Sequence, residues 1–218
     1  MQISENILYK NNQLIAFNKP SGIAVQEDKT EDKALINLAE IYCKSNIHII
    51  HRLDRPASGV VLFAKGKTAL TNLNQQFKDR IIKKTYLAVV KNRPEADHGE
   101  LTHYLYKQSN NKTVVLEKGA KGSKEAILHY EVIGSIDNYH LLKINLITGR
   151  HHQVRAQLGA IGSPIKGDVK YGVKRGNRDR SIHLHAWKLS FKHPVTKIEE
   201  EIIAPVPDDS VWNAFEIA

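Results

Sequence analysis

The sequence predicts an α+β fold with a mixed, largely antiparallel central sheet flanked by helices. Short runs of β-branched and aromatic residues outnumber the helical stretches, and the two kinds do not alternate regularly. No stretch rich in proline, glycine and serine divides the 218 residues, a length at which roughly 70% of the unfolded chain's surface becomes buried. We therefore expect a single domain over residues 1–218.

The chain opens with an expected pair of strands. Apolar runs at 7–9 and 14–18 flank Asn11-Asn12, a dipeptide that favours a hairpin turn. A turn at 19–22, which contains a proline and a glycine, then leads to a strand at 23–26.

Helix and strand then succeed one another. Asp32 suits the N-cap of a helix that extends to about Lys44, because the apolar residues of this segment fall on one face. Apolar strands are expected at 47–50 and 60–65, and helical spacing of apolar residues predicts a helix at 67–80.

The second half is dominated by strands. Strands are expected at 84–90 and 142–146, the latter from strict alternation of apolar and polar residues. Gly149 leads into a helix at 150–160, and Asp208 or Asp209 is the expected cap of a last helix to Ile217. The remaining expected strands cover 181–191 and 199–204.

Composition excludes several classes of protein. Hydrophobic residues make up 41% and charged residues 25%, which is typical of a folded globular chain. No apolar stretch is long enough to span a membrane, and the first residues do not resemble a secretion signal, so we expect a cytoplasmic protein without membrane contact. Cys43 is the single cysteine, which excludes an internal disulfide and makes redox chemistry unexpected.

The net charge of +9 is distributed unevenly. Residues 1–51 contain five Lys/Arg and six Asp/Glu, whereas residues 52–91 contain nine and two. A second basic cluster follows in the segment 166–180, with Lys174, Arg175 and Arg178 at its centre. Basic clusters attract polyphosphates by releasing counterions, so RNA or DNA is the expected partner, although a solvated basic face would have the same composition.

The most informative segment is His51–Gly59, with the sequence HRLDRPASG. It places the Asp54 carboxylate between Arg52 and Arg55, at the end of one apolar strand and before another. Neighbouring guanidinium groups favour the ionised form of a carboxyl group, which suits a nucleophile. The alternative is a surface turn joined by ion pairs.

A second candidate segment is Thr148–Arg155, where a strand meets the start of a helix. Its backbone N–H groups, together with Arg150, Gln153 and Arg155, are suited to bind phosphate or carboxylate, and Arg155 is placed to turn toward Asp54. A purely structural arginine that caps the sheet is the other interpretation.

These residues resemble the RluA-type RNA pseudouridine synthases. The resemblance extends over nearly the whole chain, in four blocks that follow the family's order. The blocks are FNKPSG at 17–22, HRLDRPASG at 51–59, GRHHQVR at 149–155, and GSPIKGD at 162–168 followed by Tyr171-Gly172. The family's catalytic fold with a central cleft is therefore expected, together with isomerisation of uridine in ribosomal or transfer RNA. The first block begins near Phe17, so we expect a catalytic domain without a preceding RNA-binding domain.

The resemblance also implies roles for individual residues. Asp54 matches the catalytic aspartate, Tyr86 the tyrosine that stacks on the target uracil, and Arg155 the arginine that pairs with the aspartate. Arg52 matches the residue that takes the place of the flipped base. Further RNA contacts are expected from the neighbouring and basic side chains, namely His51, Arg55, Arg150, His152, Gln153, Lys174, Arg175 and Arg178.

The chain departs from the family pattern at some supporting positions. Pro56-Ala57 stands where relatives often have an acidic residue and a threonine, His151 replaces a common threonine and Gln157 a common histidine. None of these changes touches Asp54, Tyr86 or Arg155, so the departures concern the contacts that hold the loops.

No cofactor, metal ion or obligate protein partner is expected. The chain has no nucleotide-binding glycine motif, and its histidine pairs, His183-x-His185 and His151-His152, lack the carboxylates or cysteines of common metal sites. Two rival functions remain open: an RNA-binding or chaperone module that has kept the fold and lost the reaction, and a phosphodiesterase that uses Asp54 with a metal ion.

Overall fold

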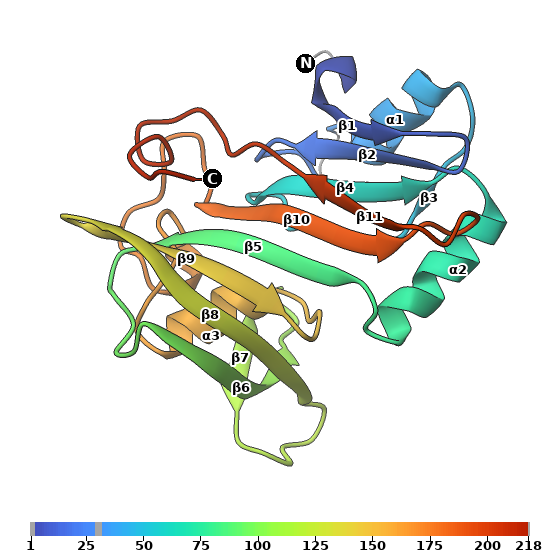
Figure 1. The fold of residues 1–218 in the computed structure, drawn as a ribbon. Coiled ribbons are helices and arrows are strands. Elements are labelled where there is room, and N and C mark those ends of the chain that lie inside the picture. Colours follow the sequence, from blue (N-terminus) through green and yellow to red (C-terminus); the bar gives the residue numbers. More distant parts are fainter. Residues whose placement is uncertain (1–2, 29–31, 218) are drawn as a thin grey trace. The chain divides into compact units, whose positions relative to one another are not determined.

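The computed structural model describes residues 3–28 and 32–217, and it confirms the α+β class (Figure 1). The chain divides into two compact units. Unit 1 consists of residues 1–84 and 186–207, and unit 2 of residues 85–185 and 208–218.

Unit 1 is a strand-rich layer with two α-helices. Its elements are the 3₁₀-helix η1 (Ile3–Asn6), β1 (Ile7–Lys10), β2 (Leu14–Lys19), α1 (Leu35–Cys43), β3 (His48–Ile49), β4 (Ser58–Ala64), α2 (Lys67–Lys78), most of β10 (Leu184–Lys192) and β11 (Glu199–Ile203). The strand order is β1-β2-β4-β10, with β3 paired to β4 and β11 paired to β10. Strand β4 is buried at every position, so it forms the rigid centre of the unit.

The expected hairpin of β1 and β2 is confirmed. The two strands pair antiparallel, and the Asn11 side-chain oxygen accepts hydrogen bonds from the backbone N–H groups of Gln13 and Leu14. An asparagine side chain that binds the backbone two residues ahead is the usual chemistry of such a turn.

The core of unit 1 joins residues that are far apart in sequence. Leu14 on β2, Leu62 on β4 and Leu73 on α2 pack with Phe191 on β10 and Ile202 on β11, all with at most 3% exposure. The C-terminal strands therefore complete a core that the first 84 residues begin.

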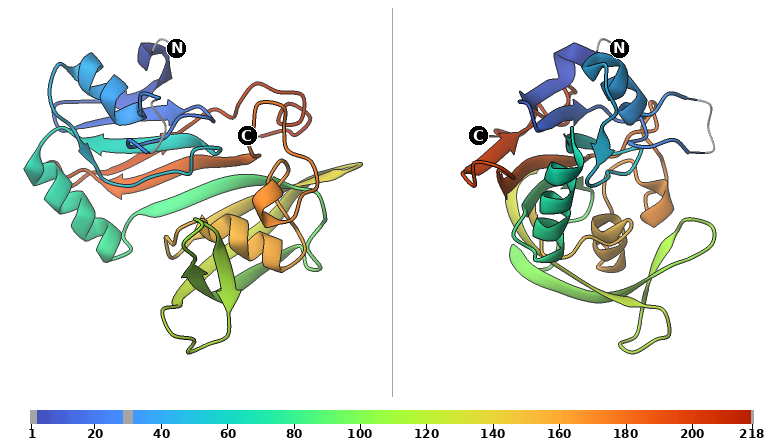
Figure 2. Two further views of the ribbon diagram at one scale, coloured as in Figure 1. Left: turned by 180° about the vertical axis from the view of Figure 1, so that it is seen from behind. Right: turned by 90° about the vertical axis from the view of Figure 1, so that its right-hand side faces the viewer.

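Unit 2 is an antiparallel sheet with one helix against it. Its elements are β5 (Lys83–Val90), whose first two residues belong to unit 1, β6 (His98–Lys107), β7 (Thr113–Leu116), β8 (Lys124–Ile136), β9 (Tyr139–Leu146), α3 (Gln153–Ala160) and the 3₁₀-helix η2 (Val169–Tyr171). The strand order is β5-β9-β8-β6-β7. Figure 2 shows α3 beside the β6–β7 hairpin.

Gln157 fixes α3 to this sheet. Its amide nitrogen lies within hydrogen-bond distance of the Leu101 carbonyl oxygen on β6 and the Ala126 carbonyl oxygen on β8, at 2.8 and 3.1 Å. The glutamine that departs from the family pattern therefore has a structural use as a clamp between helix and strands.

Two expected elements are wrong, and a third begins later than expected. Residues 23–26 form no strand. The helix expected from Asp32 to about Lys44 is present as α1, but it begins at Leu35, and Asp32 forms an ion pair with Arg55 instead of capping it. The last segment forms turns rather than a helix, although Asp209 does accept hydrogen bonds from the N–H groups of Val211 and Trp212, as a cap would. Over the described residues, no helix is both long and apolar enough to cross a membrane.

Candidate active site

The Asp54 loop, residues 50–57, connects β3 to β4 in unit 1. The Ala57 N–H donates to the Asp54 carbonyl oxygen at 3.1 Å, which closes a tight turn around Pro56. Asp54 is half-buried, and the strand that follows it is wholly buried. The loop therefore holds a carboxylate at the edge of a rigid strand, as the sequence predicted.

Gly59 allows two strands to approach closely beside this loop. Its φ is +114°, and a side-chain Cβ at this position would lie 2.3 Å from the Ala186 carbonyl oxygen of β10. Only glycine fits such a contact, so the glycine of the HRLDRPASG segment serves the packing of β4 against β10.

Lys19 is a buried cation beneath the loop, and the sequence alone gave it no role. Its side chain is fully buried, and Nζ lies within hydrogen-bond distance of four carbonyl oxygens, at 2.6 to 3.2 Å. Two acceptors belong to the turn after β2 (Pro20 and Ile23) and two to the Asp54 loop (Arg55 and Ala57). Lys19 therefore ties the loop to the turn of the FNKPSG block.

Burial dominates the electrostatics of Lys19. Desolvation lowers the pKa of Lys19 to about 7, the Asp54 carboxylate acts to raise it, and the Arg55 guanidinium adds to the lowering. The Asp54 carboxylate therefore favours the charged form of Lys19, against the effect of burial.

The two arginines beside Asp54 have partners that the sequence did not indicate. Arg55 forms ion pairs with Asp28 at 2.9 Å and Asp32 at 3.0 Å, and donates to the Gly22 carbonyl oxygen. Arg52 is exposed and donates to the side-chain oxygen of Gln26 at 3.0 Å. Arg55 thus anchors the loop to the segment that follows β2.

His51 has a structural role within unit 1. Its Nε2 accepts the Leu62 N–H at 3.0 Å, and its ring lies 5.4 Å from the ring of Phe77. Burial, with a smaller contribution from Lys84, lowers the pKa of His51 to about 4, so the ring is neutral near pH 7. A neutral acceptor occupied by a backbone N–H does not support the expected RNA contact.

Tyr86 lies on β5 in unit 2, directly opposite Ile144 of β9, and its side chain is half-buried. A half-buried aromatic ring on a paired strand has the rigidity that a stacking surface requires.

The start of α3 is held by the residues of the GRHHQVR block. Gln153 is 3% exposed, and its side-chain oxygen accepts from the Arg150 N–H and the Thr148 hydroxyl, while its amide nitrogen donates to Ile127 O. Both ends of the amide are used inside the fold, so an RNA contact by Gln153 is not supported. Arg150 donates through Nε to the Glu125 carbonyl oxygen.

Arg155 is buried and paired with Asp168. Nε donates to one carboxylate oxygen at 2.6 Å and Nη2 to the other at 2.9 Å, with exposures of 5% and 1% for the two residues. The guanidinium also lies over the ring of Tyr171, with Cζ 5.0 Å from the ring centre. Asp168 belongs to the GSPIKGD block, which was the only sequence signal for this partner.

His152 continues the same network. Its Nδ1 lies 2.8 Å from the Tyr171 hydroxyl, which also accepts the Thr113 N–H. The ring of His151 stacks on the ring of His152, with 3.8 Å between the two ring centres. Burial and the neighbouring charges, Arg155 foremost, lower the pKa of His152 strongly, so this imidazole is neutral.

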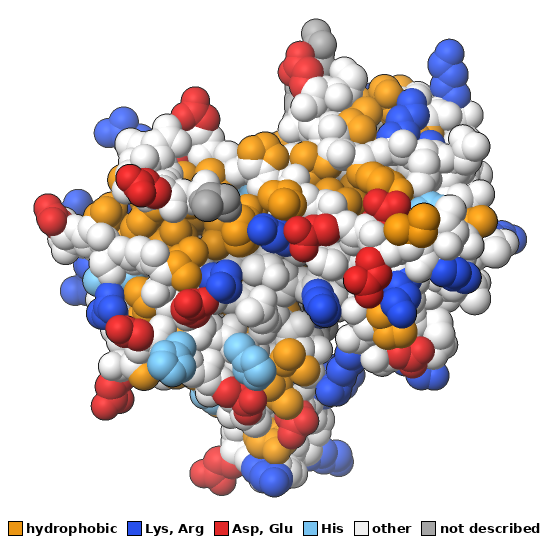
Figure 3. Space-filling model, in the orientation of Figure 1, with side chains coloured by type: hydrophobic (Ala, Val, Ile, Leu, Met, Phe, Trp, Pro, Cys, Tyr) orange, Lys and Arg blue, Asp and Glu red, His pale blue; other side chains and the backbone are white. Residues whose placement is uncertain are grey.

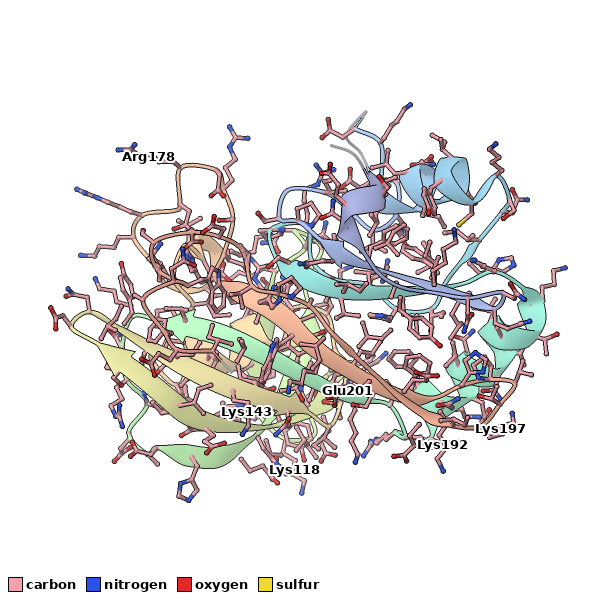
Figure 4. All side chains as sticks on the ribbon, turned by 45° about the horizontal axis from the view of Figure 1, so that its top comes forward. Lys118, Lys143, Arg178, Lys192, Lys197 and Glu201 are labelled. Carbon is pink, nitrogen blue, oxygen red and sulfur yellow. The ribbon has the colours of Figure 1, made fainter. Side chains whose placement is uncertain are left out.

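The basic loop, residues 173–181, carries the expected RNA-binding side chains Lys174, Arg175 and Arg178, all exposed. Figure 4 shows Arg178 pointing away from the ribbon. Within the loop, the Asn177 side chain accepts a hydrogen bond from Lys166 Nζ and donates one to the Ser181 carbonyl oxygen, so the backbone that carries these exposed cations is anchored.

The outer surface of β8 and β9 differs from the basic loop. Its charges form cross-strand pairs such as Lys143–Glu131 at 2.6 Å, and acidic and basic side chains are interspersed on the face in Figure 3. A surface of mixed sign attracts polyphosphate less than the basic loop does.

The histidines that resembled metal ligands have packing roles. His183, one residue before β10, and His185 on β10 both contact the ring of Trp212, at 5.4 and 6.1 Å between ring centres, although the sequence placed both histidines on one strand. Within the described part of the chain, no three His, Cys, Asp or Glu side chains are grouped as metal ligands.

The fold is that of the pseudouridine synthases. It matches the solved structure of the human RNA pseudouridylate synthase domain-containing protein 1 with a TM-score of 0.78 at 24% identity, covering 96% of this chain and 86% of that chain. A similar match, with a TM-score of 0.77 at 24% identity over 94% and 90% of the two chains, is found for the human domain-containing protein 4.

The sequence defines the family. Residues 13–160 match the model of the RNA pseudouridylate synthase family, and the chain belongs to that family. It is 32% identical to an uncharacterised RNA pseudouridine synthase of Mycoplasma genitalium over 92% of this chain and 66% of the relative. It is 34% identical to a ribosomal large subunit pseudouridine synthase C of Buchnera aphidicola over 95% of this chain and 68% of the relative. A tRNA pseudouridine synthase C of Pasteurella multocida is 31% identical over 94% and 92%. The chain thus spans about two thirds of the length of the first two relatives.

Proposed function

We propose that this chain isomerises specific uridines to pseudouridine in structured ribosomal or transfer RNA in the cytoplasm. The observation that carries the proposal is the match of residues 13–160 to the family, which includes Asp54 on its anchored loop. Relatives named for ribosomal and transfer RNA both lie at similar identity, so the sequence comparison does not favour one RNA over the other.

Asp54 is the proposed nucleophile. In the reaction the bond between ribose C1′ and uracil N1 breaks, a bond from C1′ to C5 forms, C5 loses its proton and N1 gains one. A carboxylate can attack either the ribose or the uracil ring, and in both cases it retains the base while the base turns. The contacts of Lys19 and Arg55 support this role, because they fix the loop before substrate binds.

Tyr86, Arg155 and Arg52 are proposed to complete the site in a single catalytic domain with a central cleft. Tyr86 would stack on the uracil of a flipped uridine, Arg155 would pair with Asp54, and Arg52 would occupy the space that the base leaves. Extruding a base costs a few kcal/mol, and one aromatic stack returns about 1–3 kcal/mol. Phosphate contacts must supply the rest, which is the role we assign to the basic loop, Arg150 and His152.

The experiment compares wild type with Asp54→Asn. Pseudouridine is mapped across total RNA from cells without the gene and from cells that carry either version, and the missing site names the substrate. We expect wild type alone to restore it. In vitro, release of tritium from carbon 5 of labelled uridine should disappear in the variant while RNA binding persists, and full activity of the variant would refute the role of Asp54.

The alternative of a non-catalytic RNA-binding module predicts RNA binding without tritium release from the wild-type protein. Family membership does not favour it, because Asp54, Tyr86 and Arg155 are all present. The same assay therefore separates the two functions.

A further inference from the structure

Arg155 is held from two sides by residues of one short segment, 168–171. Asp168 binds the Nε and Nη2 edge of the guanidinium through two hydrogen bonds, and the Tyr171 ring covers one of its faces. A bidentate carboxylate and a stacked ring together fix both the position and the plane of a guanidinium.

Asp168 and Tyr171, which hold Arg155, are themselves fixed by hydrogen bonds. The Asp168 N–H donates to Ile165 O, and the Asp168 carbonyl oxygen accepts from the N–H groups of Tyr171 and Val173. The Tyr171 hydroxyl accepts the Thr113 N–H at 2.8 Å, which ties the ring to the first residue of β7. The backbone of Asp168 and the ring of Tyr171 are therefore both held in place by hydrogen bonds to the backbone.

Stability alone is a poor explanation for this arrangement. A buried ion pair loses the hydration of two charges, and apolar residues of similar volume often serve the stability of a fold as well or better. What the pair supplies, and an apolar cluster would not, is a charged group in one orientation.

We propose that Asp168 and Tyr171 are positioning residues for Arg155, and that by fixing its guanidinium they set the rate of the chemical step rather than the affinity for RNA. The inference rests on the proposed function and extends it to two residues outside the family's catalytic set. Asp168 and Tyr171 also lie directly before the basic loop in the chain. The same short segment therefore supports Arg155 and leads into the basic loop.

The first experiment measures single-turnover tritium release and RNA dissociation constants for Asp168→Asn. The matched control is Asp97→Asn, which removes the same charge from an exposed aspartate of unit 2 that is also paired with an arginine, Arg93. We expect a loss of about 100-fold in rate for Asp168→Asn, the scale of a misplaced catalytic group, with a dissociation constant within about threefold of wild type. The control should keep a rate within about threefold of wild type.

A double-mutant cycle separates positioning from a general structural role. Arg155→Lys keeps the positive charge but loses the planar guanidinium that binds Asp168 through two nitrogens. Adding Asp168→Asn to the Arg155→Lys variant should therefore lower the rate of tritium release by less than about threefold. A full, additive loss in the Arg155→Lys background would overturn the proposal, as would an unchanged rate in the wild-type background.

Tyr171 provides a second test in case Asp168→Asn does not fold, which far-UV circular dichroism would show. Tyr171→Phe keeps the ring over Arg155 and Tyr171→Leu removes it, while both lose the hydroxyl. We expect a lower rate for the leucine variant than for the phenylalanine variant at similar RNA affinity, and equal rates contradict the proposal. Absence of tritium release from the wild-type protein would instead refute the proposed function.

Discussion

Replacing Lys19 by methionine tests whether the cation beneath the Asp54 loop loses its proton when the chain is folded. Methionine has a similar length and no charge, so the variant removes the titration together with the polar contacts of Nζ with four carbonyl oxygens. Comparing the two proteins over a range of pH isolates the contribution of the charge.

The magnitude follows from the difference in pKa between the folded and unfolded chain. Burial lowers the pKa of Lys19 from 10.5 to about 7. Between these two pKa values the unfolded chain binds a proton at Lys19 that the folded chain does not bind. The free energy of unfolding of the wild type therefore increases as the pH rises from 7 toward 10.5, and this gain disappears as the pH falls back toward 7. At about 1.4 kcal/mol per pH unit, the advantage of the wild type over Lys19→Met should grow by about 2 kcal/mol between roughly pH 7.5 and 9.

The assay is urea unfolding of both proteins at several pH values in this range. Lys65→Met is the control, because it also removes a hydrogen bond from a lysine to a carbonyl oxygen of unit 1, that of Asn11. Its difference from wild type should stay constant. A constant difference for Lys19→Met as well would refute the reasoning and would mean that the four carbonyl oxygens keep Lys19 charged despite burial.

Three further changes test other parts of the chain. Gly59→Ala should reduce the free energy of unfolding by roughly 3–5 kcal/mol, because its Cβ would meet the Ala186 carbonyl oxygen at 2.3 Å, and a loss below about 1 kcal/mol in urea unfolding would contradict that contact. Tyr86→Phe should preserve RNA affinity and lower single-turnover tritium release only if the hydroxyl transfers a proton; a normal rate would limit Tyr86 to stacking. Replacing the three exposed cations of the basic loop by alanine should weaken RNA binding and reduce the slope of log affinity against log salt by about 2 to 3, whereas an unchanged slope would place the RNA elsewhere. Those cations are Lys174, Arg175 and Arg178.

Elements whose signal is local were predictable from sequence. The hairpin around Asn11, the buried strand β4 and the helix α2 each follow from turn chemistry or from the period of their apolar residues. The start of α1 was predicted too early because the side chain of the expected cap, Asp32, is used for a distant partner, Arg55, 23 residues along the chain. Local pattern cannot anticipate such a competition.

The site was predictable in its reactive group and not in its supports. Asp54 stands out in the sequence because it lies in a short charged segment between two apolar strands. The structure places it on the loop that precedes β4, as expected. Lys19 and Asp168 lie in sequence blocks that resemble the family, yet nothing in the spacing shows that Lys19 meets Ala57, 38 positions away, or that Asp168 binds Arg155. Contacts of this kind depend on how the strands pair.

The division of unit 1 into two chain segments has a consequence during synthesis on the ribosome. Residues 1–84 carry one side of its core, but Leu189, Phe191 and Ile202 on the other side are translated more than 100 residues later. Until then the apolar face of β4 lacks its neighbour β10, and a nascent chain stalled within unit 2 exposes that face to chaperones or to aggregation. Residues 1–84 therefore cannot complete their own core first, and the Asp54 loop gains its rigid base only after β10 and β11 have been translated.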